Sequence, residues 1–170
     1  MAVERRPATE DEARTLASPL RLRILRLCLD VSLTNKEIAE RLGKDPASVL
    51  YHVRRLVRTG FLVAEEERRG TRGAREVPYR STGKSWTLSI GESEDPRLAA
   101  SSLVEAFVQD AARAGLENLD GTRMGLRLTP DEHEELAQRL YELIEEFRLR
   151  ESDGAPWSLF IGMHPDDRPV

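Results

Sequence analysis

The sequence contains a single cysteine, Cys28, among 170 residues. One thiol cannot form an internal disulfide, and it cannot supply the several thiolates of a closed zinc site. Disulfides are rare in the reducing cytoplasm, so a chain built without them is expected there. The cysteine content therefore predicts a cytoplasmic protein with no thiolate-bound metal.

Long apolar runs are also missing. The first apolar stretch, residues 16–31, is interrupted by Arg21, Arg23 and Arg26. This pattern predicts neither a signal peptide nor a membrane span. Aromatic residues make up 5% of the chain, whereas charged residues make up 33%. Such a composition is typical of a soluble helical protein with many surface ion pairs.

The motifs of an enzyme are absent as well. We find no phosphate-binding loop and no arrangement of a nucleophile with a base. The one acid–base cluster combines His133 with Asp131 or Glu134. A solvated helix face explains this cluster better than catalysis does. We therefore expect no enzymatic activity, no catalytic residues and no cofactor.

Charge is distributed unevenly along the chain. The formal net charge is -4. Residues 1–90 contain 18 Lys and Arg and 12 Asp and Glu, which gives +6, and residues 91–170 contain 8 and 18, which gives -10. Asymmetry of this kind suggests that the first half meets a polyanion, although two ordinary solvated surfaces would also produce it.

The first element expected is a helix that follows a polar arm. Residues 1–15 are polar and predict a flexible N-terminal arm. Ser18 is a favourable N-cap, and Pro19 suits the first position of a helix. The run LRLRILRLCL that follows also alternates like a strand, but its length and leucine content favour a helix.

Two further helices are predicted directly after it. Thr34 and Glu37 have the spacing of a capping box, and Gly43 ends the helix that they start. Asp45 can then cap a third helix over residues 46–58. Two short helices joined by so tight a turn predict a helix-turn-helix.

A hairpin with a basic tip is predicted next. Residues 61–67 and 76–82 are extended segments, and the stretch between them is rich in glycine and arginine. Glycine at the tip predicts a flexible turn. Its arginines could cross a phosphate backbone and enter a minor groove.

The helix over residues 46–58 has one face for packing and one for a ligand. Val49, Val53 and Leu56 form the inward stripe. The other side carries small, hydroxyl-bearing and basic side chains, which suit close entry into a major groove and hydrogen bonding to bases and phosphates. His52 borders the stripe and is interpreted either as a partly buried hydrogen-bonding residue or as a DNA contact. The predicted DNA-binding residues are Lys44, Ala47, Ser48, Tyr51, His52, Arg54, Arg55, Arg58, Arg68, Arg69, Arg72 and Arg75.

Residues 16–82 resemble the winged-helix domain of the ArsR-like transcriptional regulators. The resemblance rests on LASPLRLRILRLC (16–28), LTNKEIAERLGKDPASVLYHVRRLVRTGFL (33–62) and YRSTG (79–83). It implies a dimeric repressor that binds an inverted repeat in a promoter. It also implies that residues 46–58 are the recognition helix and residues 61–82 the wing.

The metal sites of that family are not matched. Thiol-sensing members carry a cysteine pair, whereas this chain has only Cys28. Other members bind zinc through D-x-H and H-x-x-E pairs on a late helix. Residues 131–133 match the first pair only superficially, and Ile144 stands where the next histidine should be. We therefore expect no zinc site.

The second half contains helical stripes that need a partner. A helix is predicted over residues 95–119 with Leu103, Phe107, Ala111 and Ala114 at helical spacing. Another helix, starting at Thr129, is expected between short strands at residues 124–128 and 157–163. Its apolar stripe is formed by Leu136, Leu140, Leu143 and Phe147. The second half offers little sequence in which to bury such stripes, which fits a dimerisation or effector module. The alternative is that its aromatic residues fill a core of its own, and these are Phe107, Tyr141, Phe147, Trp157 and Phe160.

The predicted architecture is mainly α with a small amount of β (α+β). A flexible arm covers residues 1–15, a winged helix-turn-helix domain residues 16–90, and a C-terminal helical or α+β dimerisation or effector region residues 91–170. The predicted function is sequence-specific binding to double-stranded DNA by a homodimer, most simply as a repressor, with an effector as a further partner of the C-terminal region. The alternative is a winged helix that contacts another protein and binds no DNA.

Overall fold

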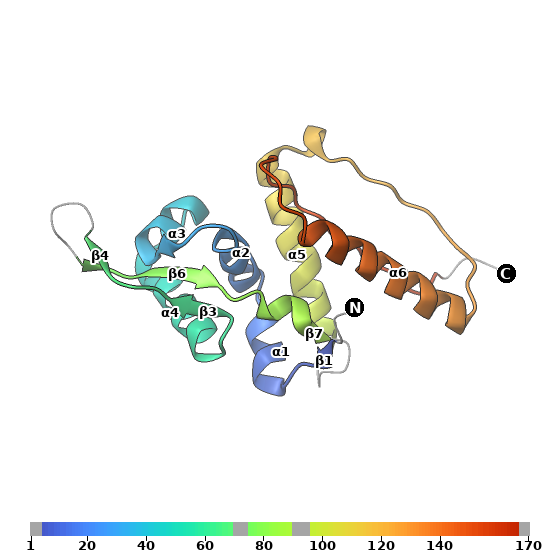
Figure 1. Ribbon diagram of the computed structural model, residues 1–170, viewed down its shortest axis with the longest axis horizontal. Helices are drawn as coiled ribbons and strands as arrows, with labels where there is room; N and C mark the ends of the chain where they lie inside the picture. The colour runs from blue at the N-terminus through green and yellow to red at the C-terminus, as the bar shows by residue number, and fades with distance from the viewer. Residues whose placement is uncertain (1–4, 70–74, 90–95, 167–170) are drawn as a thin grey trace. The chain divides into compact units, whose positions relative to one another are not determined.

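The computed structural model describes residues 5–69, 75–89 and 96–166. The fold is mixed α and β and rich in helix, as predicted from the sequence (Figure 1). The α-helices are α1 (Glu10–Leu16), α2 (Pro19–Leu27), α3 (Asn35–Leu42), α4 (Pro46–Arg58), α5 (Pro96–Ala114) and α6 (Pro130–Arg148). The strands are β1 (Arg6–Pro7), β2 (Leu33–Thr34), β3 (Leu62–Ala64), β4 (Arg68–Arg69), β5 (Arg75–Glu76), β6 (Pro78–Ser81) and β7 (Leu88–Ser89). Two short 3-10 helices are η2 (Lys84–Thr87) and η3 (Leu116–Asn118).

Helices α2, α3 and α4 begin where their caps predict. The Ser18 hydroxyl accepts a hydrogen bond from the backbone N–H of Arg21 at the start of α2. Helix α3 starts with a reciprocal capping box between Thr34 and Glu37. Gly43 ends α3 with φ of 61°, a left-handed conformation that glycine adopts without steric cost. Local chemistry thus sets the boundaries of these helices.

One apolar core holds the three helices and the adjoining strands together. Its centre is formed by side chains with almost no exposed surface. They are Leu16, Ile24, Cys28, Ile38, Val49, Val53, Leu56, Phe61 and Leu88. The core therefore contains side chains from the helix-turn-helix and from the segments before and after it.

The wing is a hairpin that projects away from the helices (Figure 1). Strand β3 pairs antiparallel with β6, with Leu62 opposite Ser81 and Ala64 opposite Tyr79. The short pair β4 and β5 continues the hairpin toward its tip. Strand β2, which the sequence did not predict, adds to the other edge of β6, so the sheet order is β2-β6-β3.

Residues 5–15 are folded, in contrast to the flexible arm predicted for residues 1–15, of which residues 1–4 lie outside the described part. Strand β1 pairs in parallel with β7, with Arg6 opposite Leu88. Helix α1 follows, capped by Thr9 and Glu12 in a second reciprocal capping box. The arm was mispredicted because the pairing partner of β1 lies about 80 positions later in the chain.

Helix α5 belongs to the same compact unit as the winged helix. One unit of the chain ends at Asn118 and the other begins at Leu119, which differs from the boundary predicted at residue 90. Small residues on α5, namely Ala99, Ser102 and Ala106, are buried, which allows close approach to α2. The Arg23 Nε atom on α2 lies 2.6 Å from a carboxylate oxygen of Asp110 on α5.

The buried face of α5 differs from the predicted one. The predicted stripe contained Leu103, and that side chain is exposed. A helix-period pattern identifies a helix, but the small residues of α5 fit against α2 better than the large ones do.

The unit that begins at Leu119 contains one long helix. Helix α6 starts as predicted, with Thr129 and Glu132 in a capping box. The predicted strands at residues 124–128 and 157–163 are not formed in the described structure. A strand forms by pairing with another strand, and the sheets of the described residues include neither segment. Along residues 5–69, 75–89 and 96–166, no helix is long and apolar enough to cross a membrane.

Candidate nucleic-acid interface

Helix α4 is fixed to the domain by its inward face and by its N-terminus. The side chains of Val49, Val53 and Leu56 are completely buried in the core. The Asp45 carboxylate caps the helix by accepting a hydrogen bond from the backbone N–H of Ser48 at 3.0 Å. Asn35, at the start of α3, donates to the carbonyl of Pro46 at 2.9 Å. These contacts leave the opposite face of α4 free to meet a ligand.

The outward face of α4 carries a line of exposed side chains. Ala47, Tyr51, Arg54 and Arg58 follow one another at spacings of four, three and four residues, so they lie along one side of the helix. The Tyr51 side chain is 68% exposed. Ser48 and Lys44 are exposed near the N-terminal end of the same helix. The line therefore combines small, hydroxyl-bearing and cationic side chains, which is the chemistry expected of a major-groove reader.

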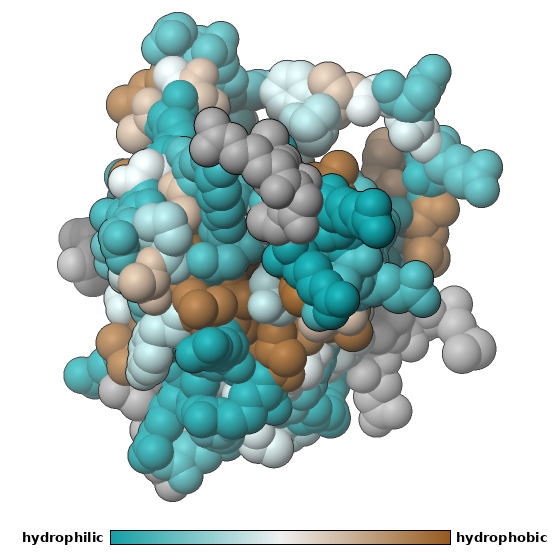
Figure 2. Space-filling view, turned by 90° about the vertical axis from the view of Figure 1, so that its left-hand side faces the viewer, coloured by the Kyte–Doolittle hydropathy of each residue, from teal (hydrophilic) through white to brown (hydrophobic). Residues whose placement is uncertain are grey.

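Several of the cations predicted to bind DNA are exposed on this surface. Within the described residues, the side chains of Lys44, Arg54, Arg58 and Arg69 make no hydrogen bond or ion pair. Unpaired guanidinium and ammonium groups keep all their donors available for phosphate or base acceptors. The molecular face on the wing side is mostly hydrophilic, with a smaller apolar area near its centre (Figure 2).

Arg55 points away from this surface, although the sequence predicted it to bind DNA. Its Nε donates to the hydroxyl of Thr15 on α1 at 2.8 Å. Its Nη2 contacts the Asp11 carboxylate and donates to the Asp11 carbonyl at 3.3 Å. The side chain is only 20% exposed. The structure thus uses Arg55 to join α4 to α1, and the outward line continues through Arg54 instead.

His52 lies in a half-buried position beside Arg21. Its Nδ1 is 3.5 Å from an Nη atom of Arg21. Burial lowers the pKa of His52, and the nearby positive charge of Arg21 lowers it further. The Tyr51 and His52 rings meet edge to face, with centroids 5.3 Å apart. Of the two interpretations left open by the sequence, the geometry matches the partly buried hydrogen-bonding residue.

The wing arginines differ in their surroundings. One Nη atom of Arg68 contacts both carboxylate oxygens of Glu37 on α3, at 2.8 and 2.7 Å. Arg75 pairs at 3.7 Å with Glu67 within the wing, and both groups are exposed. Arg69 is exposed, and Arg72 lies outside the described residues. Arg68 therefore braces the wing against α3, whereas Arg69 is available to a ligand.

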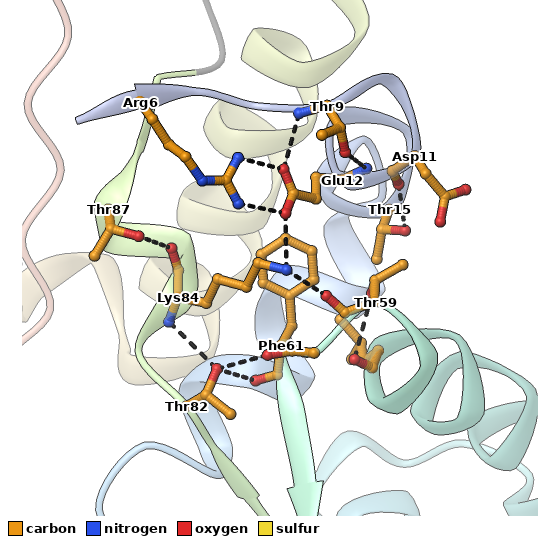
Figure 3. Close-up of polar contacts among 12 residues, drawn as sticks. Arg6, Thr9, Asp11, Glu12, Thr15, Thr59, Phe61, Thr82, Lys84 and Thr87 are labelled. Atoms are coloured by element: carbon orange, nitrogen blue, oxygen red, sulfur yellow. Dashed lines mark hydrogen bonds and ion pairs between the residues drawn. The ribbon is translucent and has the colours of Figure 1, made fainter.

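A polar network around Glu12 was missed by the sequence reasoning (Figure 3). The buried Glu12 carboxylate accepts from two Nη atoms of Arg6 at 2.8 and 2.6 Å, and from the backbone N–H of Thr9 at 2.8 Å. The ammonium group of Lys84 lies 2.7 Å from the same carboxylate and donates to the Thr59 carbonyl at 2.6 Å. The signal was present, because Thr9 and Glu12 have the same capping-box spacing as Thr34 and Glu37.

The described residues offer no metal centre. No group of three His, Cys, Asp or Glu side chains within residues 5–69, 75–89 and 96–166 could hold a metal ion. Asp131 lies in the first turn of α6. Glu132 accepts from the backbone N–H of Thr129 at 2.7 Å. Both positions suit acids that stabilise a helix N-terminus.

A comparison with protein families matches one region in the first half of the chain. A family model described as a helix-turn-helix domain matches residues 16–65. That range contains α2, α3, α4 and β3, so the predicted helix-turn-helix is confirmed. The match covers less than one third of the chain, and the narrower resemblance to ArsR-like regulators stays a prediction. A comparison with curated proteins finds no match.

Solved structures with some similarity include three bacterial proteins. Reduced HlyU from Vibrio cholerae is 22% identical, with 56% of this chain and 81% of that chain covered and a TM-score of 0.35. A variant of ZitR from Lactococcus lactis is 23% identical, with coverage of 75% and 73% and a TM-score of 0.35. The adhesin competence repressor AdcR from Streptococcus pyogenes is 19% identical, with coverage of 75% and 78% and a TM-score of 0.35. Likenesses of this strength carry no functional argument.

Proposed function

We propose that this protein is a sequence-specific regulator of transcription that binds double-stranded DNA through α4 and the wing. The observation that carries the proposal is the outward face of α4, where Arg54 and Arg58 lie exposed and without a partner among the described residues. Arginine can donate two hydrogen bonds to guanine, and exposed cations can also contact phosphates. An acidic protein that exposes these cations on a capped helix anchored in the core has the electrostatic footprint of a DNA reader.

The arrangement of α4 suggests how contacts divide between bases and backbone. The small Ala47 and Ser48 at the N-terminal end allow the helix to approach base edges closely. Lys44 and Arg58, at opposite ends of the exposed line, suit phosphates on the two sides of the groove. Arg69 on the wing suits the neighbouring backbone. Arg55 and Arg68 are left out of the proposed contact set because both are held by acidic residues of the protein.

We propose that the protein acts as a homodimer on an inverted repeat. Support comes from α5, which exposes most of its large apolar side chains. Val104 and Val108 are 47% and 54% exposed, and Leu103 is exposed beside them. A second copy that covered this face would place two α4 helices on one DNA, with half-sites about one turn, roughly 34–36 Å, apart. The resemblance to ArsR-like regulators implies that the protein represses transcription.

The unit that begins at Leu119 is proposed to contribute to dimerisation or to bind an effector. Among its described residues, only Glu145 is buried, while Trp157 is 81% exposed. A segment of this size builds only a marginal core alone. Its apolar side chains therefore need a further surface, which a second copy or an effector could provide.

Selection of bound duplexes from a random DNA pool tests the proposed function. The full chain is incubated with the pool at near-physiological salt, and bound DNA is sequenced after several rounds. We expect enrichment of an inverted repeat with half-sites about one turn apart. If only salt-labile binding without enrichment occurs, sequence-specific recognition is contradicted. If nothing binds even at low salt, the alternative of a protein-contact module replaces it.

A further inference from the structure

Helix α1 contacts α4 at two separate places, although it lies outside the helix-turn-helix. The first contact is made by Arg55 on α4, which donates to the Thr15 hydroxyl at 2.8 Å and pairs with the Asp11 carboxylate. This contact adds to the buried stripe of Val49, Val53 and Leu56 in setting the rotation of α4 about its own axis. About 100° around the helix axis separates Arg55 from Arg54, so a rotation of α4 that broke the Arg55 contact would also move Arg54 from its exposed position.

The second contact reaches the C-terminal end of α4 through Lys84. Its ammonium group joins the Glu12 carboxylate of α1 to the carbonyl of Thr59, the residue that caps α4. The same group lies 5.1 Å from the centroid of the buried Phe61 ring, at the start of the wing (Figure 3). A single lysine thus ties α1 to the point where the helix ends and the wing begins.

The N-terminal segment is itself anchored, so it can hold α4 in place. Ala13 and Leu16 of α1 are buried. Arg21 on α2 donates to the carbonyl of Arg14 at 2.9 Å and to that of Thr15. Strand β1 pairs with β7, just after Lys84. The two contacts therefore connect α4 to a fixed part of the domain rather than to a loose end.

We infer that α1 is a positioning element for DNA reading, and that Asp11, Thr15 and Arg55 form a brace that sets the orientation of Arg54 and Arg58. This inference rests on the proposed DNA-binding function. In it Arg55 is a positioning residue and does not contact DNA. If substitution of Arg55 weakens DNA binding, the competing explanation is that Arg55 contacts a phosphate directly.

Two substitutions of α1 separate the brace from a direct contact. Asp11→Asn makes the protein less acidic, so simple electrostatics predicts equal or tighter binding to DNA. Loss of the brace predicts weaker binding instead. Thr15→Val removes the hydroxyl that receives Arg55 while keeping the shape of the side chain. For each variant we expect roughly a five- to tenfold loss of affinity for the selected duplex.

Two control variants separate loss of the brace from changes in net charge and in folding stability. Glu10→Gln changes the net charge by the same amount on the neighbouring residue, which pairs with Arg14 rather than with α4. Ile24→Val removes a buried methyl group from the core without removing a polar contact. Both controls are expected to bind DNA as the unaltered protein does, at a temperature where all variants are folded by circular dichroism.

The salt dependence of binding and a double-mutant cycle decide the role of Arg55. For a positioning residue, Arg55→Ala leaves the slope of log affinity against log salt unchanged, and Arg55→Ala with Thr15→Val weakens binding no more than either alone. A slope reduced by about 0.9, with additive losses, would show a phosphate contact and overturn the inference.

Amide hydrogen exchange tests the brace without DNA. In Asp11→Asn and Thr15→Val, the amides of residues 55–61 are expected to exchange faster than in the Glu10→Gln control. Unchanged exchange together with unchanged affinity overturns the inference. If the unaltered protein binds no duplex while exchange responds as expected, the proposed function fails and the brace remains as a feature of the fold.

Discussion

Arg54 and Arg55 are adjacent on α4, but their side chains have opposite surroundings. Arg54 is exposed and has no partner among the described residues, whereas Arg55 donates to Thr15 on α1 at 2.8 Å. One arginine is therefore available to a ligand, and the other is part of the scaffold. A count of charges in the sequence cannot separate these two roles, because both side chains carry the same positive charge.

Arg54→Ala is expected to weaken binding to the selected duplex by roughly 1–3 kcal/mol and to relax the base preference at one position of each half-site. The reason is the loss of a guanidinium group that can donate two hydrogen bonds to guanine. Fluorescence anisotropy at one fixed salt concentration measures the affinity. Arg139→Ala on α6 is the control, because it removes the same charge from an exposed helix elsewhere. Equal losses in the two variants would attribute the effect to net charge alone.

Val108→Glu on α5 is expected to shift the protein from dimer to monomer. A carboxylate placed in an apolar contact between two copies would be desolvated without a partner, which is strongly unfavourable. Sedimentation equilibrium over a range of protein concentrations measures the assembly. Val31→Glu, at another exposed apolar position, is the control. A dimer that persists in Val108→Glu would mean that this face of α5 is not the interface.

Glu12 makes stability depend on pH in the acidic range. Hydrogen bonds from Arg6, and further ones from Lys84 and Thr9, hold the pKa of Glu12 well below its ordinary value of 4.5. A carboxyl group of this kind stabilises the folded state above its unfolded pKa, and the contribution is lost as the pH falls through 4.5 and below. Stability should therefore decline below that pH. Urea unfolding at a series of pH values measures it.

Glu12→Gln tests this assignment. At neutral pH the variant is expected to be less stable by roughly 1–3 kcal/mol, because buried donors lose a charged acceptor. Its stability should depend less on pH, and it should approach that of the unaltered protein under strongly acidic conditions. Glu10→Gln serves as the exposed control. Two parallel curves of stability against pH would contradict the role of Glu12.

Cys28 is expected to resist thiol reagents in the folded protein. Its side chain is completely buried, and burial raises the pKa of the thiol to about 12. The reactive thiolate is therefore nearly absent at neutral pH. A chromogenic disulfide reagent should react only as urea unfolds the protein, with the fully unfolded chain as the positive control. Fast reaction in native buffer would contradict the buried placement.

Much of the winged helix could be predicted because its signals are local. Thr34 with Glu37, Gly43 and Asp45 each act within one helical turn, so their spacing in the sequence is their spacing in space. The inward stripe of α4, including Val49 and Val53, follows from helical periodicity alone. Thr9 and Glu12 have the same capping-box spacing, but the polar composition of residues 1–15 favoured the prediction of a flexible arm.

The remaining features depend on contacts between distant parts of the chain. The direction of Arg55 is decided by α1, which lies some 40 positions earlier. The pairing of β1 with β7 and of β2 with β6 has no short-range signature. The buried face of α5 is chosen by Arg23 and the surface of α2, rather than by the size of its own apolar residues.

The sequence by itself determined where the helices of the helix-turn-helix begin and end, which face of α4 is apolar, and that basic residues gather on α4 and the wing. Those properties come from backbone capping and from periodicity, which act over a few residues. Only the tertiary structure decided which arginines are left for a ligand. A guanidinium group pairs with whichever carboxylate folding brings near, as Asp11 does for Arg55 and Glu37 for Arg68.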